Sequence, residues 1–438
     1  MVYVPIHLGA VKANHHVPPL FAVPQMNLGF WLIPAFVILT LFLLFWRKLV
    51  DHPRISIARF LTISTGIFLL ISISVAMIDG YKEVDGKRLP ALLEPYTRLS
   101  LEYYGDVPLL DKVGLYHFLK NYAKPDIFPK LSGHAQTHPP GSVIFLWAVS
   151  KIFGYNLIST SLISILFTSI TIIPIYLLAK KLYGEKVGRL SIVLFLVMPN
   201  FVMFTSTSMD GPFSVFPILS VYLFFKSVSS PHKISAICVG LCLSLGMLMT
   251  YSTVFIGLYF IILVILSFIV DRQRFRHVMK MLSISLISFI AFYVLLFVFT
   301  NFNPFEAVWV SIKKDEAGMG TGYETVGRYV SLSIANLFSF LIGVGVPLTV
   351  SWIYGTVKSI QESWDLFPFS YLVTLIIIAF STLYTMEVER IWIFMAPFIV
   401  IPAAKYLHQR NNLSDLRWVI SLTVLQLLLF EVMLYTYW

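Results

Sequence analysis

Two histidines and two consecutive prolines stand close together in the segment 132–141, SGHAQTHPPG. The proline pair fixes the backbone and can start a helix at a defined angle. An imidazole beside it can hydrogen-bond a phosphate or orient a carboxylate. We expect His138 to contact a phosphate group and His134 to contact substrate, while the ordinary alternative is a pair of solvated loop histidines.

Two aspartates are candidates for a general base. Asp79 stands in the segment 77–81, MIDGY, at the end of an apolar run, and Asp106 in the segment 102–108, EYYGDVP. A carboxylate held at a membrane surface is suited to removing a proton from an acceptor hydroxyl or amine. The alternative for each is a turn aspartate without chemistry, and the sequence does not decide between the two residues.

A third acid, Asp210, lies in the segment 206–213, STSMDGPF, between two apolar runs. It either caps the helix opened by Gly211 and Pro212 or helps to position substrate.

The segment 385–392, TMEVERIW, opens a later apolar run. Arg390 is suited to bidentate binding of a phosphate, beside the free backbone N–H groups expected at the head of a helix. Glu387 and Glu389 are then candidates for substrate contact, and an Arg–Glu pair that only anchors a helix end is the alternative.

Lys313 lies in a polar segment, 301–329, where it would add to the positive field, although Asp315 and Glu316 follow it. Three glycines at 318, 320 and 322 predict a mobile lid here. No metal-ligand spacing and no cofactor motif is recognised; whether a divalent metal is needed is left open.

The composition determines which elements must carry these residues. The chain has 438 residues, of which 58% are hydrophobic and 12% charged, and its mean hydropathy is +0.81. These values exclude a water-soluble globule and predict an all-α polytopic membrane protein. Cys238 and Cys242 are one helical turn apart in an apolar run and are expected to be packing residues.

Twelve apolar runs are expected to cross the membrane, at 28–46, 58–78, 155–178, 187–204, 211–227, 232–249, 252–270, 279–300, 330–354, 367–384, 391–406 and 416–436. A thirteenth run, 141–153, would reach only about 20 Å as a helix and is too short to cross. We expect it to be a juxtamembrane or re-entrant helix.

Charge orients these spans. If 141–153 does not cross, the short loops rich in Lys and Arg all fall on one side, which predicts that this side is cytoplasmic. Both termini, the long polar loop 79–140, the loop 301–329 and the turns at Asp210 and Glu387 then face outward. The basic loops are explained as topology signals and contacts with anionic membrane lipids, so no nucleic-acid partner is expected.

The order of these features resembles the GT-C superfamily of polyprenyl-phosphate-sugar-dependent glycosyltransferases, and within it the protein mannosyltransferase and aminoarabinose transferase type. The resemblance covers roughly residues 58–405. The matching elements are a span that ends in an acid, a long first outer loop, and the short motifs YYGD at 103–106, THPPG at 137–141, FG at 153–154, KKLYG at 180–184, MPN at 198–200 and DGP at 210–212.

The resemblance implies a GT-C-like catalytic domain over 58–406, preceded by a segment with one extra span, 1–57, and followed by a C-terminal span, 407–438. It places the first-loop catalytic carboxylate on Asp79 or Asp106. The sequence departs from the family pattern there, because Gly80 and Tyr81 follow Asp79 where an Asp-Glu pair is usual.

The function implied is transfer of a sugar from a polyprenyl-phosphate donor to an extracytoplasmic acceptor at the cell membrane, with inversion. In this reading Asp79 or Asp106 is the base, and Arg390, aided by His138 or Lys313, binds the donor phosphate. Two rivals remain at this point: a transporter or flippase of a lipid-linked saccharide, and a membrane hydrolase or acyltransferase.

Overall fold

The computed structural model describes residues 19–20, 22–51, 55–84, 86–229, 232–270, 272–384 and 386–436. The first 18 residues of the predicted N-terminal segment, and Thr385, lie outside this range. Helices make up most of the described chain, which confirms the predicted all-α class. Two small antiparallel sheets complete the described chain. One pairs β1 (Ala22–Pro24) with β4 (Leu434–Thr436), and the other pairs β2 (Tyr81–Val84) with β3 (Lys87–Pro90).

The chain divides into two compact units, and neither is continuous in sequence. The first comprises Met1–Leu92, Ile165–Ser214 and Thr321–Trp438, and the second comprises Leu93–Ser164 and Val215–Gly320. Two of the unit boundaries fall inside helices. The helices α9 (Leu157–Ser169) and α13 (Asp210–Ser229) are therefore each divided between the two units. The sequence predicted three consecutive domains, 1–57, 58–406 and 407–438. Their boundaries do not coincide with those of the two units, and the three-domain division stays a prediction.

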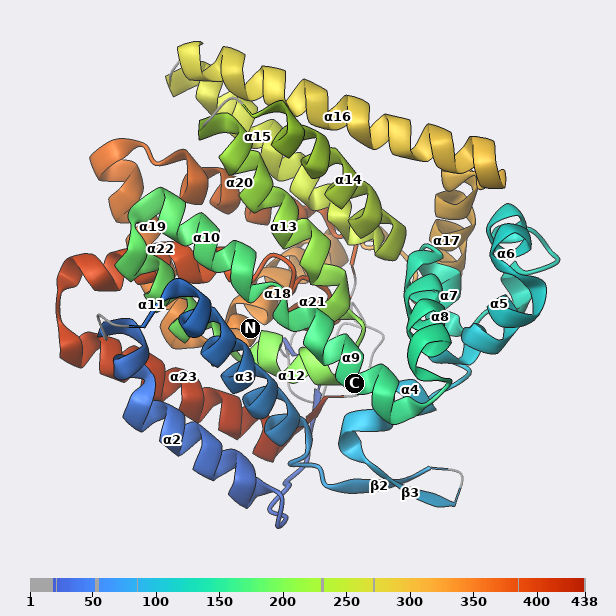
Figure 1. The fold of residues 1–438 in the computed structure, drawn as a ribbon, viewed down its shortest axis with the longest axis horizontal. Helices are drawn as coiled ribbons and strands as arrows, with labels where there is room; N and C mark the ends of the chain where they lie inside the picture. Colours follow the sequence, from blue (N-terminus) through green and yellow to red (C-terminus); the bar gives the residue numbers. More distant parts are fainter. Residues whose placement is uncertain are drawn as a thin grey trace. The chain divides into compact units, whose positions relative to one another are not determined.

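The first unit contains the elements β1 (Ala22–Pro24), α2 (Leu32–Asp51), α3 (Ile57–Ala76), β2 (Tyr81–Val84), β3 (Lys87–Pro90), α10 (Ile172–Tyr183), α11 (Glu185–Phe195), α12 (Pro199–Thr207), α18 (Val326–Val344), α19 (Val346–Ser363), α20 (Leu366–Ser381), α21 (Val388–Ile391), α22 (Pro397–Arg410), α23 (Leu413–Met433) and β4 (Leu434–Thr436). The short helix η1 (Ala91–Leu93) ends its first segment. Its core is aromatic where α3, α11 and α12 meet: the ring of Phe195 lies 5.7 Å from that of Phe68 and 4.5 Å from that of Phe201. Helices α2, α3 and α23 pack side by side (Figure 1).

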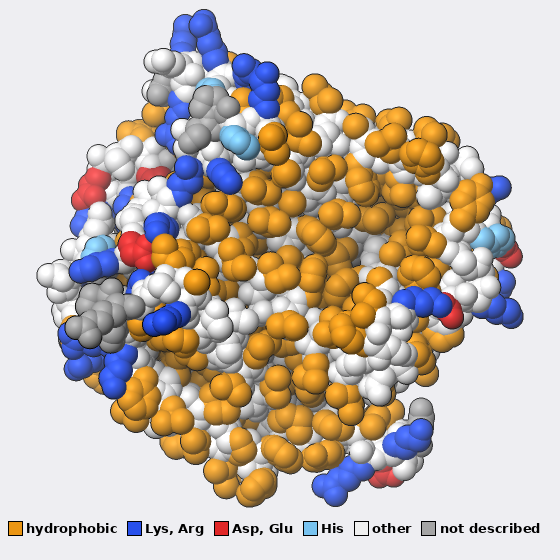
Figure 2. Space-filling model, viewed as in Figure 1, with side chains coloured by type: hydrophobic (Ala, Val, Ile, Leu, Met, Phe, Trp, Pro, Cys, Tyr) orange, Lys and Arg blue, Asp and Glu red, His pale blue; other side chains and the backbone are white. Residues whose placement is uncertain are grey.

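The second unit contains α4 (Glu94–Thr97), η2 (Tyr103–Asp106), α5 (Val107–Val113), α6 (Leu115–Asn121), η3 (Phe128–Lys130), α7 (Gly133–Thr137), α8 (Gly141–Phe153), α14 (Lys233–Met249), η4 (Tyr251–Thr253), α15 (Val254–Val270), α16 (Arg272–Thr300) and α17 (Pro304–Met319). Helices α14, α15 and α16 pack together, and α16 leaves most of its apolar side chains exposed, as expected of a helix that faces lipid. Figure 2 shows a broad hydrophobic surface with Lys and Arg gathered toward its edges.

Within the described residues, eight helices are long and apolar enough to cross a membrane, or nine if α11 and α12, bent by 58°, form one span. The chain is therefore a multi-pass membrane protein, but the predicted number of twelve spans is not confirmed. Helices α8, α14 and α20 are apolar but shorter.

Two predicted spans were wrong in their boundaries. The run 330–354 is broken into α18 and α19 at Gly345, whose φ of 113° ends the first helix. The run 391–406 begins with a buried turn at 392–396, and α22 starts only at Pro397. In both runs the apolar composition hid a backbone break, because hydropathy does not report the dihedral angles that glycine and proline impose.

The short helix after the proline pair was predicted correctly. It runs from Gly141 to Phe153, with Pro140 at its N-cap, and Gly154 ends it with a φ of 80°. Thirteen residues span about 20 Å, less than the hydrocarbon core of a bilayer.

Side-chain contacts in the first unit hold its basic loops together. Arg189 of α11 donates to the carbonyls of Leu49 and Ile55, and so ties α11 to the connection between α2 and α3. Lys405 and Tyr183 both contact Asp365, at 3.0 and 2.6 Å. The loops joined by these contacts are ones that the sequence analysis placed together on the cytoplasmic side. Which side of the membrane they face stays a prediction.

Candidate functional site

Arg390 lies at the centre of a buried ion cluster in the first unit. Its Nη1 donates to Asp210 Oδ2 at 3.0 Å, and its Nη2 donates to Glu387 Oε2 at 2.5 Å. All three side chains are about one-tenth exposed. The structure thus brings Asp210 to Arg390, which lies 180 positions later in the sequence and three positions after Glu387. The cluster holds two carboxylates and one guanidinium.

The backbone around Arg390 differs from the prediction. Arg390 belongs to the four-residue helix α21, not to the head of a long span, so the expected row of free N–H groups beside it was wrong. Glu387 precedes α21 with a φ of 61°, a left-handed conformation that is unfavourable for a residue other than glycine.

Asp210 uses its carboxylate for Arg390 rather than for a helix cap. It is the first residue of α13, and its Oδ2 also accepts a hydrogen bond from the Ser208 hydroxyl at 2.9 Å. The capping alternative does not describe these contacts, whereas a positioning role is compatible with them.

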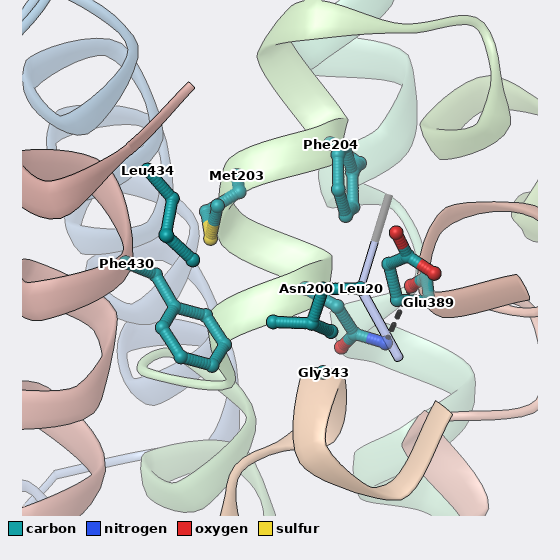
Figure 3. Close-up of a pocket in the computed structure, with 8 residues that line it drawn as sticks. All are labelled: Leu20, Asn200, Met203, Phe204, Gly343, Glu389, Phe430 and Leu434. Carbon is teal, nitrogen blue, oxygen red and sulfur yellow. Dashed lines mark hydrogen bonds between the residues drawn. The ribbon is translucent and has the colours of Figure 1, made fainter. Parts of the chain in front are cut away.

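A pocket adjoins this cluster. It is lined by Leu20, Asn200, Met203, Phe204, Gly343, Glu389, Phe430 and Leu434 (Figure 3). In Figure 3 the α23 residue Phe430 and its neighbour Leu434 lie on one side, and Glu389 lies on the other. Helix α12 runs between them and supplies Asn200.

Glu389 is held in this wall by its neighbours. Its carboxylate accepts a hydrogen bond from Ser339 of α18, and its backbone carbonyl accepts one from Asn200 Nδ2 at 3.0 Å. A Cβ at position 343 would lie 2.9 Å from the Glu389 Cβ, so glycine is required for α18 to approach this segment.

Asp79 lies in the turn after α3, three residues beyond the last helical residue. Its Oδ1 accepts a hydrogen bond from Asn27 Nδ2 at 2.5 Å, and its Oδ2 lies 3.1 Å from Lys82 Nζ. The side chain is 20% exposed. Each oxygen thus has one donor and keeps further accepting capacity.

Asp106, in the second unit, has a more closed environment. Its side chain is 3% exposed, and its oxygens accept from the Ser132 backbone N–H at 2.9 Å and from the Ser132 hydroxyl at 2.6 Å. Burial raises its pKa from 3.8 to about 6, and the two Ser132 hydrogen bonds oppose that rise. These contacts suit a carboxylate that ties η2 to the start of α7.

The rings of His134 and His138 lie 6.1 Å apart, and both contact Tyr103. The ring of Tyr103 is 5.8 Å from His134 and 5.6 Å from His138, and His134 Nδ1 is 3.1 Å from Glu102 Oε1. His138 Nδ1 lies 3.0 Å from the His134 carbonyl oxygen. The same Nδ1 lies 3.1 Å from the Thr137 hydroxyl oxygen, so two contacts hold the His138 ring against α7.

The loop 301–329 is not the glycine-rich lid that the sequence predicted, because sixteen of its residues form α17. Lys313 lies on α17, where it pairs with Glu316 at 2.8 Å and lies 5.0 Å from the centre of the Trp309 ring. Lys124 pairs with Glu306 at 2.5 Å, so the two polar loops predicted to face one side are in contact within the second unit.

The candidate residues therefore fall into two groups. Arg390, Asp210, Glu387, Glu389 and Asp79 belong to the first unit, and Asp106, His134, His138 and Lys313 belong to the second. Over the described part of the chain, no group of three or more His, Cys, Asp or Glu side chains is arranged to hold a metal ion. Asp210 and Glu387 are both paired with Arg390.

Several residues of the site were missed by sequence reasoning. Asn27, Lys82, Ser132, Asn200 and Ser339 were not assigned a role. Glu431 was the most visible omission, since an acid in the last turns of an apolar span is costly and marks a functional position by default. Nothing in the local sequence of Asn27 or Ser132 points to the carboxylate that each one contacts.

The sequence matches a family model described as dolichyl-phosphate-mannose-protein mannosyltransferase over residues 137–297. Two solved structures of the oligosaccharyltransferase of Archaeoglobus fulgidus share the fold. One is a complex with Zn and sulfate, with 13% identity and a TM-score of 0.53 over 84% of this chain. The other, AglB with an inhibitory peptide and a dolichol-phosphate, has 12% identity and a TM-score of 0.54 over 86% of this chain.

This confirms the GT-C superfamily prediction. The chain has a GT-C fold and resembles a glycosyltransferase-type family over the stretch from THPPG through DGP to α16. It spans about half of the length of the two oligosaccharyltransferase chains, 53% and 56%. No curated protein matches the sequence significantly. Asp79, Asp106 and Arg390 lie outside the matched family segment.

Proposed function

We propose that this GT-C protein is an integral-membrane glycosyltransferase that moves one sugar from a polyprenyl-phosphate donor to an acceptor on the extracytoplasmic side of the cell membrane. The matched family and the dolichol-phosphate complex of the archaeal neighbour support a lipid-linked donor. The acceptor is a lipid, glycan or protein hydroxyl or amine that reaches the outer face.

One observation carries the proposal. A single pocket has the end of α23 on one side and Glu389, the neighbour of Arg390, on the other (Figure 3). Asp79 lies beside the same end of α23, because its partner Asn27 donates a backbone hydrogen bond to the Val432 carbonyl at 2.8 Å. Asp79 is thus connected through Asn27 to the end of the helix that lines the pocket, and Arg390 follows the pocket residue Glu389 in the chain.

The proposed reaction is a single displacement. The Asp79 carboxylate takes the proton of the acceptor hydroxyl, the acceptor oxygen forms a bond to the anomeric carbon, and the bond from that carbon to the phosphate oxygen breaks. The polyprenyl phosphate leaves with the electron pair, and one displacement inverts the anomeric centre. General-base assistance of this kind contributes about 10²–10⁴ in rate.

Arg390 stabilises the charge that develops on the leaving phosphate. Asp210 and Glu387 each accept a hydrogen bond from one terminal nitrogen of Arg390, and we propose that the phosphate binds by displacing one of these carboxylates. Glu387 is the partner to be displaced, since its left-handed backbone is strained and Asp210 is additionally held by Ser208.

We keep Asp106 as the alternative base and propose that it chiefly fixes the loop that carries His134 and His138. Asp210 and Glu389 are proposed to contact substrate, while the roles of His138 and Lys313 at the donor phosphate and of His134 at the substrate stay predictions from the sequence.

The test is to incubate the purified protein with a panel of synthetic polyprenyl-phosphate sugars and candidate acceptors, following free polyprenyl phosphate and glycosylated product. We expect equimolar release and transfer with at least one donor, inverted at the anomeric carbon. Asp79→Asn should lower kcat by 10²–10⁴ while leaving donor affinity within about twofold.

Counterflow of intact labelled donor across vesicles without any product would contradict the proposal and favour transport. Release of free sugar without transfer would favour a hydrolase. Full activity of Asp79→Asn would remove Asp79 as the base.

A further inference from the structure

The segment that precedes the extra N-terminal helix reaches Asp79. Asn27 lies 52 residues before Asp79, and its amide Nδ2 donates to Asp79 Oδ1 at 2.5 Å. Lys82 of β2 approaches the other oxygen at 3.1 Å. Asn27 and Lys82 thus hold one oxygen each.

Asn27 is itself fastened to the end of α23. Its backbone N–H donates to the Val432 carbonyl at 2.8 Å, and the N–H of Gln25 donates to the Met433 carbonyl at 3.0 Å. Carbonyls in the last turn of a helix have no partner within that helix, so this segment satisfies two of them. The pairing continues into β1, where Pro24 lies opposite Leu434 of β4.

A second contact holds the same segment against the turn of Asp79. A Cβ at Gly80 would lie 3.2 Å from the Trp31 ring, and the Trp31 and Tyr81 rings are 5.8 Å apart. The contact places the start of α2 directly against the residues that flank Asp79. Two independent attachments, one on each side of Asn27, thus fix where its amide lies.

We propose that Asn27 is a positioning residue for Asp79: its amide holds one carboxylate oxygen so that the remaining accepting positions face the acceptor hydroxyl. This inference rests on the proposed role of Asp79 as the base. The extra N-terminal segment is then a part of the reaction centre that supplies an oriented hydrogen-bond donor. The charged groups that bear on Asp79 are Lys82 of β2 and Glu431 of α23.

The physical reason is geometric. A carboxylate at the end of a short side chain rotates about its terminal bond unless a donor fixes it, and a neutral amide fixes it without neutralising its charge. Lys82 alone would hold the carboxylate as a flexible point charge, which imposes less orientation than a backbone-anchored amide. Loss of the amide should therefore slow proton transfer more than it weakens donor binding.

Four variants test this in the donor-release assay. Asn27→Ala removes the donor, Asn27→Asp keeps the shape but replaces the donor by a second carboxylate, Asp79→Asn removes the base, and the exchange variant combines Asn27→Asp with Asp79→Asn. Asn412→Asp is the matched control, because it makes the same change at the N-cap of α23, where aspartate also caps well.

We expect Asn27→Ala and Asn27→Asp to lower kcat at least tenfold with the donor KM within about twofold, and Asn412→Asp to keep the wild-type kcat. The exchange variant restores the hydrogen bond with its direction reversed. Its melting temperature should therefore return to within a few degrees of wild type, while its activity stays as low as that of Asp79→Asn.

Wild-type kcat in both Asn27 variants, with Asp79→Asn inactive, would overturn the positioning role while leaving the proposed function intact. Recovery of activity in the exchange variant would also overturn the positioning role of Asn27. It would show that the hydrogen bond between positions 27 and 79 matters only for structure, whichever of the two positions carries the carboxylate. Full activity of Asp79→Asn is a different result, since it rejects the base and not only its positioning.

Discussion

Burial dominates the chemistry of Asp106. Because its pKa rises from 3.8 to about 6 on folding, the folded state binds the proton more tightly than the unfolded chain. The stability that this proton contributes is fully present below about pH 4 and is lost as the pH rises through 6. Ionised Asp106 therefore opposes folding at neutral pH despite its two hydrogen bonds from Ser132.

We expect the free energy of unfolding of the wild-type protein to rise by about 1 kcal/mol relative to that of Asp106→Asn between pH 7 and pH 5. An amide can occupy the same space and accept from the Ser132 backbone N–H, so the variant should fold. Melting temperatures in detergent at the two pH values measure the difference. A parallel pH response in both proteins would show that Asp106 does not titrate in this range.

Glu387 and a phosphate compete for the same guanidinium in this account. We expect Glu387→Gln to bind free polyprenyl phosphate roughly tenfold more tightly than wild type, about 1.4 kcal/mol, because the competing charge is gone. Product inhibition in the transfer assay measures this. Glu324→Gln is the control, since it removes an exposed acid 3.9 Å from Arg328 on α18.

Weaker inhibition of Glu387→Gln than of wild type would mean that Glu387 does not occupy the phosphate position. An equal change in Glu324→Gln would mean that the effect comes from net charge alone.

At the level of residues, the sequence predicted the acids and the arginine but not their partners. Asp210, Glu387 and Arg390 were recognisable because charge in an apolar chain is conspicuous. Asn27 and Ser132 are neutral and lie in polar segments, so only the fold reveals that they hold Asp79 and Asp106.

Helix α8 depends on a close approach at its first residue. A Cβ at Gly141 would lie 2.3 Å from the Leu248 carbonyl oxygen of α14. We expect Gly141→Ala to cost about 1–3 kcal/mol, because the two helices must move apart. Gly257→Ala on α15 is the control, because nothing lies within 4 Å of the added Cβ. We expect its free energy of unfolding to rise by no more than ~1 kcal/mol, since alanine has the higher helix propensity.

Thermal melting of both variants provides the comparison. A Gly141→Ala protein as stable as wild type would show that α8 and α14 do not pack this closely. A loss as large in Gly257→Ala, where the added Cβ meets nothing, would show that the loss in Gly141→Ala does not come from the contact with α14.

At the level of elements, prediction succeeded where the backbone signal was local. The proline pair and Gly154 delimit α8, and both ends were foreseen. The break at Gly345 was missed because the surrounding residues are apolar, and α17 was missed because three glycines suggested mobility. Asn303 provides the missing signal for α17, since its side chain accepts from the N–H groups of Phe305 and Glu306.

At the level of the whole molecule, the sorting of charge is the property on which the proposal depends. Within the first unit, Arg189 and Lys405 make contacts that join loops predicted to be cytoplasmic. A sequence can predict this sorting because Lys and Arg retain loops in the cytoplasm. It cannot predict the number of crossings where helices are broken, as α11 and α12 and then α18 and α19 show.

The central claim is that Asp79 and Arg390 serve one reaction centre that opens to the outside. The most direct test is labelling of single cysteines by a membrane-impermeant maleimide in right-side-out vesicles, with Cys238 and Cys242 replaced by alanine. Tyr81→Cys and Leu383→Cys report on the two segments, since these side chains are 42% and 58% exposed, and Lys358→Cys reports on the basic side.

We predict that the cysteines at 81 and 383 are both labelled in sealed vesicles, whereas the one at 358 is labelled only after permeabilisation. Labelling of the cysteines at 81 and 383 from opposite sides of the membrane would contradict a shared reaction centre and, with it, the proposed transfer reaction.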